Sequence, residues 1–337
     1  MTRALPMTTS RAKASVAALV ASVVLIGNAG AQAPAAPPED RPAQAPSAPP
    51  HEPDRPVRMP AAPQVVPFRL EDNLVRIEVE VNGHKRSGVL DSGAGAILID
   101  RQVGETLGLR AGGPAGDAAG AGPEARQLLP VTIARLAAGP LAFADVAGYA
   151  VDLGQLSSSA RFPVDVLLGA PAFKYGAVSV DYARREITFG PSASAGACAA
   201  PIPMELVHDV PVVEIEVRPA SDRPPVRLKV LVDLGTRHSA LVLGGAFVRS
   251  EAGQALVRGG IAGQVGHGVG GQVQGTVARV PEVRAGSISF GALEVSLTSE
   301  VPVFEQGVVD GTLGVPLWGD GAIGFDYPAR RICITRR

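Results

Sequence analysis

The chain has 337 residues and a nearly balanced charge, with 31 Lys and Arg against 32 Asp and Glu. This balance argues against a protein that binds nucleic acid electrostatically, because such proteins need a basic face. Hydrophobic residues make up 46% and charged residues 19%, which excludes a disordered polyelectrolyte. Two cysteines are too few for a disulfide-rich scaffold or a four-cysteine zinc site. The 40 Gly and 30 Pro residues favour strands and turns over long helices.

The N-terminus has the pattern of an export signal. Basic residues without any acidic residue precede an apolar run at 14–26, and small residues at 29–33 have the Ala-x-Ala spacing of a cleavage site. The apolar run is too short for a membrane-spanning helix. We therefore predict a signal peptide over 1–33 and a periplasmic or secreted protein. The alternative is an N-terminal anchor that is not cleaved.

Residues 34–66 alternate Pro and Ala with scattered charges. Such a composition cannot bury a core and favours extended polyproline conformations. We predict a disordered tether between the export signal and the folded part. An inhibitory pro-segment is the alternative, although no part of this stretch is amphipathic.

From residue 67 onward the chain repeats itself. Residues 67–81 resemble 203–217, and each ends in apolar residues that alternate with charged ones, the pattern of a half-buried strand. Two further pairs of matching blocks follow in the same order at nearly constant offsets. The period is far too long for a solenoid. We predict two similar β-rich lobes, at 67–199 and 200–337.

Each lobe is rich in strands, turns and glycine, with little sustained helical periodicity. The best helix candidates are short, at 100–109 in the first lobe and 246–257 in the second. Many short strands predict an all-β barrel or sandwich in each lobe.

Each lobe carries one aspartate after an apolar strand and before a glycine. Asp91 follows Gly-Val-Leu, and Asp233 follows Val-Leu-Val, at equivalent points of the repeat. Twofold packing of the lobes would bring the two carboxylates together. Two carboxylates in contact share one proton, because both cannot ionise cheaply. One can then act as a base toward water and the other as an acid toward a carbonyl oxygen, which suffices to hydrolyse an amide.

These motifs resemble those of the pepsin and retropepsin superfamily of aspartic proteases. The resemblance covers 67–337, and it implies two acid-protease β-barrel lobes related by a pseudo-twofold axis, with the active-site cleft between them. It implies that Asp91 and Asp233 are the catalytic pair. It also implies a supporting role for the residues around them and for the later hydrophobic-glycine motifs, namely Ser92, Gly93, Ala94, Leu234, Gly235, Thr236, Leu168, Gly169, Leu313 and Gly314.

The second copy departs from the family pattern at two positions, since Leu234 replaces a Thr or Ser and Thr312 replaces a hydrophobic residue. In the family the two hydroxyls cross-link the catalytic loops, so here Ser92 can do this from one side only. Loss of one hydroxyl is expected to loosen the pair of carboxylates. Thr236, which is placed to bond the outer oxygen of Asp233, can compensate in part.

Glycine-rich stretches at 112–122 and 263–275 occupy matching places in the two lobes. We predict mobile hairpins that close over an extended peptide and exclude water. The alternative is a pair of surface loops without a role.

The remaining motifs give weaker indications of function. The G-x-G-x-x-G pattern at 266–271 is followed by a strand pattern rather than a helix, which argues against a dinucleotide site. Asp181 and Asp326 are predicted to be turn residues and Trp318 to be a packing residue. Cys198 and Cys333 either pair or remain separate thiols. The five histidines have no metal-binding spacing, so no metal or cofactor is expected; they are His51, His84, His208, His238 and His267.

The sequence thus predicts an exported aspartic endopeptidase whose partner is a peptide or protein substrate in the cleft between the lobes. Neither nucleic-acid binding nor stable membrane insertion after signal cleavage is expected. A peptide-binding module without turnover on the same fold is the first alternative, motivated by Leu234. A structural envelope protein is the second, suggested by the Pro-rich tether.

Overall fold

A computed structural model describes residues 60–113, 124, 126–192 and 198–336, together with the course of three short strands at 24–25, 56–58 and 117–119. Apart from the first two of these strands and residues 60–66, the predicted signal peptide and tether lie outside the described residues.

The strands are β1 (Val24–Leu25), β2 (Pro56–Arg58), β3 (Gln64–Pro67), β4 (Arg69–Glu71), β5 (Leu74–Val81), β6 (His84–Leu90), β7 (Ile97–Asp100), β8 (Asp117–Ala119), β9 (Arg126–Gln127), β10 (Leu129–Ala138), β11 (Leu141–Val151), β12 (Val166–Leu168), β13 (Ala177–Asp181), β14 (Glu186–Gly190), β15 (Ile202–Pro203), β16 (Glu205–Val207), β17 (Val210–Arg218), β18 (Val226–Val232), β19 (Leu241–Leu243), β20 (Ile261–Gly268), β21 (Gly271–Ala285), β22 (Ile288–Leu297), β23 (Gly311–Leu313), β24 (Ala322–Asp326) and β25 (Arg331–Thr335). The helices are α1 (Arg101–Thr106), α2 (Gly154–Ala160), α3 (Gly245–Arg249), α4 (Glu251–Gly259) and α5 (Pro302–Glu305), with 3-10 turns η1 (Ala170–Ala172) and η3 (Val315–Leu317).

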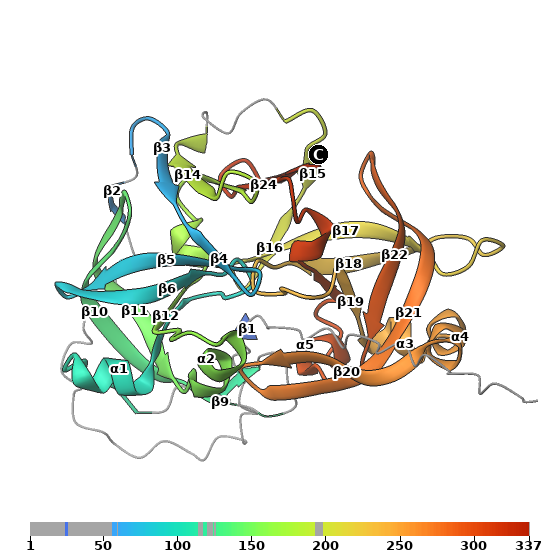
Figure 1. Ribbon diagram of the computed structural model, residues 1–337, viewed down its shortest axis with the longest axis horizontal. Coiled ribbons are helices and arrows are strands. Elements are labelled where there is room, and N and C mark those ends of the chain that lie inside the picture. The colour runs from blue at the N-terminus through green and yellow to red at the C-terminus, as the bar shows by residue number, and fades with distance from the viewer. Residues whose placement is uncertain are drawn as a thin grey trace, which may run out of the picture.

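The first lobe is a closed barrel of strands in the order β10-β11-β7-β12-β6-β5, in which β10 pairs with β5 to close the ring (Figure 1). Along β5, Ile77, Val79 and Val81 are buried while Glu78 and Glu80 are exposed. This alternation follows from the two-residue period of a strand, which sends every second side chain into the barrel.

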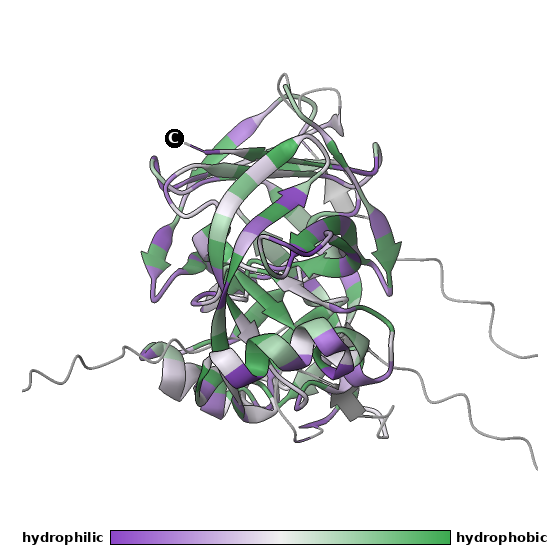
Figure 2. Ribbon diagram, turned by 90° about the vertical axis from the view of Figure 1, so that its right-hand side faces the viewer, coloured by the Kyte–Doolittle hydropathy of each residue, from purple (hydrophilic) through white to green (hydrophobic). Residues whose placement is uncertain are grey.

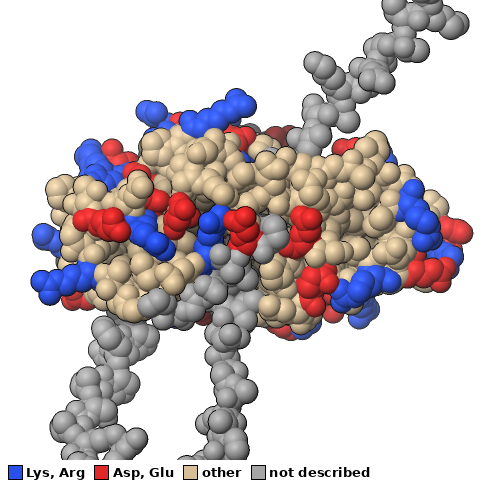
Figure 3. All heavy atoms as spheres, turned by 90° about the horizontal axis from the view of Figure 1, so that it is seen from below, with Lys and Arg blue, Asp and Glu red and all other residues tan. Residues whose placement is uncertain are grey.

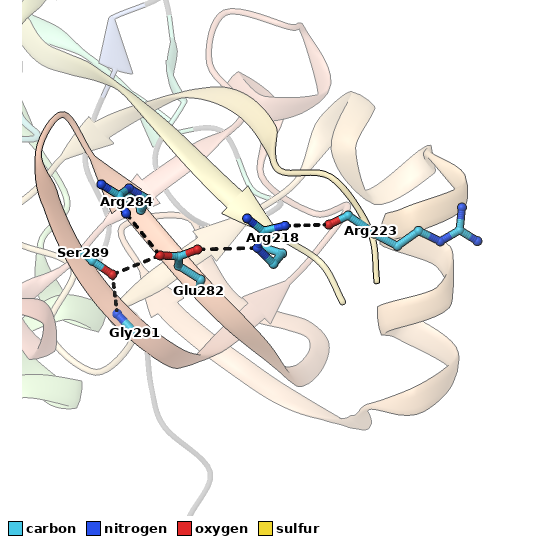
Figure 4. A network of polar contacts seen from close by, with 6 residues as sticks. All are labelled: Arg218, Arg223, Glu282, Arg284, Ser289 and Gly291. Carbon is cyan, nitrogen blue, oxygen red and sulfur yellow. Dashed lines mark hydrogen bonds and ion pairs between the residues drawn. The ribbon is translucent and has the colours of Figure 1, made fainter. Parts of the chain in front are cut away.

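The second lobe repeats this order with β21-β22-β19-β23-β18-β17, closed by pairing of β17 with β21. Arg218 of β17 and Glu282 of β21 face each other across the seam at 3.5 Å, and Arg284 and Ser289 also contact Glu282 (Figure 4). Partial desolvation raises the pKa of Glu282, but the bonds from these three neighbours outweigh it and lower the pKa overall. Polar contacts of Glu282 therefore link the two strands, β17 and β21, that close this barrel.

A third sheet joins the lobes. Its order is β15-β25-β24-β13-β14-β3, so three strands from the second half of the chain lie beside three from the first half, and β13 pairs with β24 where the two sets meet. Its inward side packs on a core that spans both lobes, where the Phe173 ring lies 5.2 Å from Phe325 and 5.7 Å from Tyr327. Cys198 and Cys333 form a disulfide with 5.8 Å between their Cα atoms. This settles the alternative left open by the sequence and fastens the last strand to the junction between the lobes.

The helices are short and peripheral. Helix α1 is shorter than the predicted segment 100–109. Asp100 is its N-cap and accepts from the backbone N–H groups of Gln102 and Val103, and the helix ends at Thr106, before Gly108 with its positive φ of 68°. The prediction of one helix at 246–257 was wrong. Ser250 adopts extended backbone geometry there, ends α3 and caps α4 by accepting from Gly253 N.

Hydrophobic residues concentrate in the strands inside the second lobe, whereas its peripheral helices carry mixed residues (Figure 2). Acidic and basic side chains are interspersed on the face shown in Figure 3. Within the described residues, no helix combines the length and apolar character needed to cross a bilayer.

Candidate active site

The two candidate aspartates occupy equivalent positions in the two barrels. Asp91 follows β6 and its N–H donates to Leu168 O at 3.1 Å, whereas Asp233 follows β18 and its N–H donates to Leu313 O at 3.0 Å. Each carboxylate thus begins a loop that leaves the end of a buried barrel strand. Such a strand is a rigid support for a side chain that must be placed accurately.

The later glycine motifs let these loops pass closely. A Cβ at Gly169 would lie 2.2 Å from Ala96 O, and one at Gly314 would lie 2.3 Å from Ser239 O. Real Cβ atoms do not approach carbonyl oxygens so closely, so only glycine fits at either position. The hydrophobic-glycine motifs therefore shape the loops that carry the aspartates.

The two carboxylates converge at the boundary between the lobes. A Cβ built at Gly235 would lie 3.0 Å from both carboxylate oxygens of Asp91 and 3.1 Å from Oδ1 of Asp233. A hydrogen bond joins the two side chains. Both residues are buried, with exposed fractions of 1% for Asp91 and 0% for Asp233. Gly235 leaves the space that lets the carboxylates meet.

The surroundings of the two carboxylates differ. Burial raises the pKa of Asp91 well above its ordinary value, and the charge of Asp233 and the hydrogen bond to it act in the same direction, against weaker opposing bonds from Gly93 and Ala94. Asp233 instead accepts from Gly235 N at 2.7 Å and from Thr236 Oγ1 at 2.5 Å. Hydrogen bonds to the ionised form stabilise it. Burial and the neighbouring Asp233 therefore favour the protonated form of Asp91.

Ser92 links the two loops. Its Oγ donates to Val232 O at 2.8 Å and accepts from Leu234 N at 3.1 Å, so both bonds cross from the first lobe to the second. Leu234 is the equivalent residue of the second copy, and its side chain is fully buried in the apolar core. Of these two equivalent residues, only Ser92 therefore has a side chain that forms hydrogen bonds to the opposite loop.

The predicted hairpin at 263–275 forms as β20 and β21, which reach from the second lobe across to α2 of the first (Figure 1). Its tip residue Val269 is 1% exposed and packs among apolar residues of the first lobe. Arg126 Nε donates to Val269 O at 3.1 Å, and Glu124 N donates to Gly270 O at 3.1 Å. The hairpin is therefore docked on the opposite lobe, and the carboxylates are closed off from solvent in this conformation. Of the matching stretch 112–122, residues 114–116 and 120–122 lie outside the described residues.

The other sequence candidates are not at this site. Asp181 ends β13 and accepts from Arg184 N at 2.9 Å, whereas Asp326 pairs with Arg331 at 3.0 Å, so both organise turns. The glycine pattern at 266–271 is the tip of the hairpin and is followed by a strand, so it does not have the strand-to-helix context of a dinucleotide site. No cluster of three or more potential metal ligands occurs in the part of the chain that the structure describes.

A surface hollow of about 1360 Å³ lies on the outer face of the first lobe, beside β4, β5, β6, α1 and α2, and its lining does not include either aspartate. We place the chemistry at the buried carboxylates, because coupled acid and base groups decide where hydrolysis can occur and cavity size does not.

Sequence reasoning missed two groups of residues near the carboxylates. Tyr182 and Tyr327 begin the turns after β13 and β24; burial raises the pKa of each, and the charges of Asp233 and Asp91, respectively, add to the effect. The Asp-Tyr pair that occurs once in each repeat was the available signal. Arg237 is buried directly after Thr236. The signal for it was a cation immediately beyond the second catalytic motif.

Two closed barrels of the same strand order, with one buried aspartate each at their boundary, define a bilobal acid-protease fold, as the sequence predicted. Residues 77–172 match the family model of aspartyl proteases. Among solved structures, the chain is similar to an aspartic proteinase from Irpex lacteus, with 11% identity, a TM-score of 0.50, and coverage of 81% of this chain and 98% of that chain. No curated protein sequence matches significantly. The family match thus lies within the first lobe, and the structural similarity shows that the chain has the fold of aspartic proteases.

Proposed function

We propose that this protein is an aspartic endopeptidase that hydrolyses peptide bonds of extended polypeptides. The observation that carries the proposal is the pair of buried carboxylates that converge around Gly235, in which burial and the charge of Asp233 raise the pKa of Asp91. Such a pair supplies an acid and a base at one point, which amide hydrolysis requires.

In the reaction, the Asp233 carboxylate removes a proton from a water molecule as that water attacks the scissile carbonyl carbon. Asp91 gives its proton to the carbonyl oxygen, which forms a neutral tetrahedral intermediate. When the C–N bond breaks, Asp233 returns its proton to the leaving amine, and Asp91 recovers its own from the hydroxyl as the carboxylic acid forms. Thr236 Oγ1 holds the orientation of Asp233 through its 2.5 Å hydrogen bond.

An extended peptide is the proposed substrate because the β20–β21 hairpin offers strand backbone that can hold such a segment through backbone hydrogen bonds. Closure of the hairpin excludes water from the reaction.

We further propose that the protein acts in the periplasm or outside the cell. The signal-peptide pattern at 1–33 supports export. The Cys198–Cys333 disulfide supports an oxidising compartment, because such bonds persist there and are rare in the cytosol.

Asn substitutions test the mechanism. Asp91→Asn and Asp233→Asn each remove one member of the acid–base pair with almost no change in volume, and each is expected to abolish cleavage while the protein stays folded. Asp145→Asn is a matched control, because Asp145 is exposed and has a φ of 50° that asparagine tolerates. Cleavage that persists in either catalytic variant would refute the mechanism.

A peptide-binding module without turnover is the second candidate. Leu234 favours it, since this fully buried apolar side chain offers no hydroxyl to complete the link between the loops. This candidate predicts that the wild-type protein binds peptides without cleaving them and that Leu234→Thr does not restore turnover.

A further inference from the structure

Arg237 of the second lobe is held by the first lobe. Its side chain is 1% exposed, forms an ion pair with Asp72, and donates through Nη2 to Ser159 Oγ at 3.0 Å. Asn73 Nδ2 donates to the Arg237 carbonyl at 2.9 Å. Because Arg237 directly follows Thr236, which bonds the catalytic Asp233, its guanidinium lies at the meeting point of the second catalytic loop and α2 of the opposite lobe.

This region also lies next to the hairpin that closes the site. Helix α2 contacts β20, and the positive charge of Arg237 reaches His267 on β20, where it adds to burial in lowering the pKa of that histidine. Arg237 therefore lies near three elements, namely the second catalytic loop, α2 and β20.

Two nitrogen atoms in this region have unused hydrogen-bonding capacity. Arg237 Nε and His267 Nε2 are buried and have no hydrogen-bond partner among the described residues. Buried polar groups are almost always satisfied in native proteins, so an exception calls for an explanation. A ligand that carries acceptor oxygens would satisfy both atoms.

The first repeat does not have a cation at the position equivalent to Arg237. The equivalent of Arg237 in the first repeat is Gly95, where an added Cβ would lie 2.7 Å from His208 O. Backbone of the opposite lobe thus fills this position in one half of the site, while a guanidinium fills it in the other. The two equivalent positions of the repeat are therefore chemically different.

We propose that Arg237 is a specificity-determining residue that selects peptides carrying a carboxylate on the second-lobe side of the scissile bond. The inference rests on the proposed peptidase function, which it deepens by naming the substrate class. Guanidinium groups bind carboxylates in a planar, charge-assisted geometry, which favours them over neutral amides of the same shape. The carboxylate is an Asp or Glu side chain or the C-terminus of the peptide.

Asp72 competes with this substrate carboxylate. In the closed structure it pairs with Nη1 of the guanidinium and also lies 3.1 Å from His238 Nε2. Removing its charge leaves Arg237 more available, whereas removing Arg237 eliminates recognition. Substitutions at these two positions are therefore expected to change acid preference in opposite directions, which a purely structural ion pair does not predict.

The test uses two peptide libraries that are identical except that every Glu in one is Gln in the other, each with free and amidated C-termini. The ratio of kcat/KM between matched peptides is the readout. For the wild-type protein we expect a ratio of about 10 or more in favour of the acidic peptide, the size of effect that one buried charge-assisted hydrogen bond produces. Amidation distinguishes the sources, because it abolishes the preference only if the C-terminal carboxylate is recognised.

Arg237→Met is expected to bring the ratio close to 1, and Asp72→Asn to raise it. Arg249→Met is the matched control, since Arg249 of the same lobe pairs with Glu305 rather than with Asp72, and it should leave the ratio unchanged. The proposal is overturned if the wild-type protein prefers neither Glu over Gln peptides nor free over amidated C-termini, or if Arg237→Met leaves the observed preference unchanged. If Arg237→Met does not fold, an unchanged ratio in Asp72→Asn overturns it instead.

A failure of the proposed function is distinguishable. If the wild-type protein binds these peptides without cleaving them, the ratio of dissociation constants replaces that of kcat/KM, and the same variants decide the inference. Peptides that are neither bound nor cleaved refute both proposals.

Discussion

Replacement of Ser92 by alanine removes the one hydroxyl that joins the two catalytic loops. It deprives Val232 O and Leu234 N of their hydrogen bonds of 2.8 and 3.1 Å, in a region where both partner residues are buried. Each unsatisfied buried group costs about 1–3 kcal/mol, so the free energy of unfolding should fall by about 2–6 kcal/mol. A domain with a typical stability of about 5–15 kcal/mol survives much of this range.

The same substitution should impair catalysis more than it impairs folding. Leu234 supplies no second hydroxyl, so Ser92→Ala leaves no side-chain hydroxyl at either of these equivalent positions. A displacement of the carboxylates by about 1 Å is enough to lower the rate by about a hundredfold. We expect kcat to fall accordingly in protein that is still folded.

Urea unfolding and peptide cleavage measure the two effects. Ser158→Ala is the matched control, because its exposed hydroxyl only donates to Gly154 O at 2.8 Å within α2. The control should change the free energy of unfolding by less than about 0.5 kcal/mol. If Ser92→Ala behaves like this control in both assays, the hydroxyl does not hold the loops together and the reasoning is refuted.

Three further predictions concern the disulfide, the buried proton and the hairpin. The double substitution of Cys198 and Cys333 by serine should lower the free energy of unfolding by about 2–5 kcal/mol in denaturant titrations, and an unchanged midpoint would contradict a stabilising role. Folding raises the pKa of Asp91, so the unfolded chain loses this proton first; the free energy of unfolding should therefore decline as pH rises above about 4, and Asp91→Asn should reduce that decline. Val269→Asp places a charge in the apolar site of the opposite lobe, and we expect faster amide hydrogen exchange along β20; exchange at the wild-type rate would show that the docked tip does not hold the hairpin.

The repeat made the centre of the site predictable from sequence. Matching blocks at nearly constant offsets located Asp91 and Asp233, and a glycine after each late strand, at Gly169 and Gly314. The two-residue alternation in segments such as 75–81 reflects strands with one buried face, which is a local property that a sequence displays directly.

Contacts between the lobes were not predictable in the same way. The pairing of β13 with β24 and the Arg237–Asp72 ion pair join residues that are far apart in the chain, so no local period records them. The break at Ser250 was missed for another reason. Serine serves both as an N-cap and as an interior helix residue, and its backbone conformation decides between these roles.

The most direct test is cleavage of a diverse peptide library by the full chain from acid to neutral pH, with products identified by mass spectrometry beside Asp233→Asn. The proposed mechanism predicts internal cleavage by the wild-type protein and none by the variant. A folded wild-type protein that binds peptides but releases no products at any pH would contradict it and would identify the chain as a peptide-binding protein on this fold.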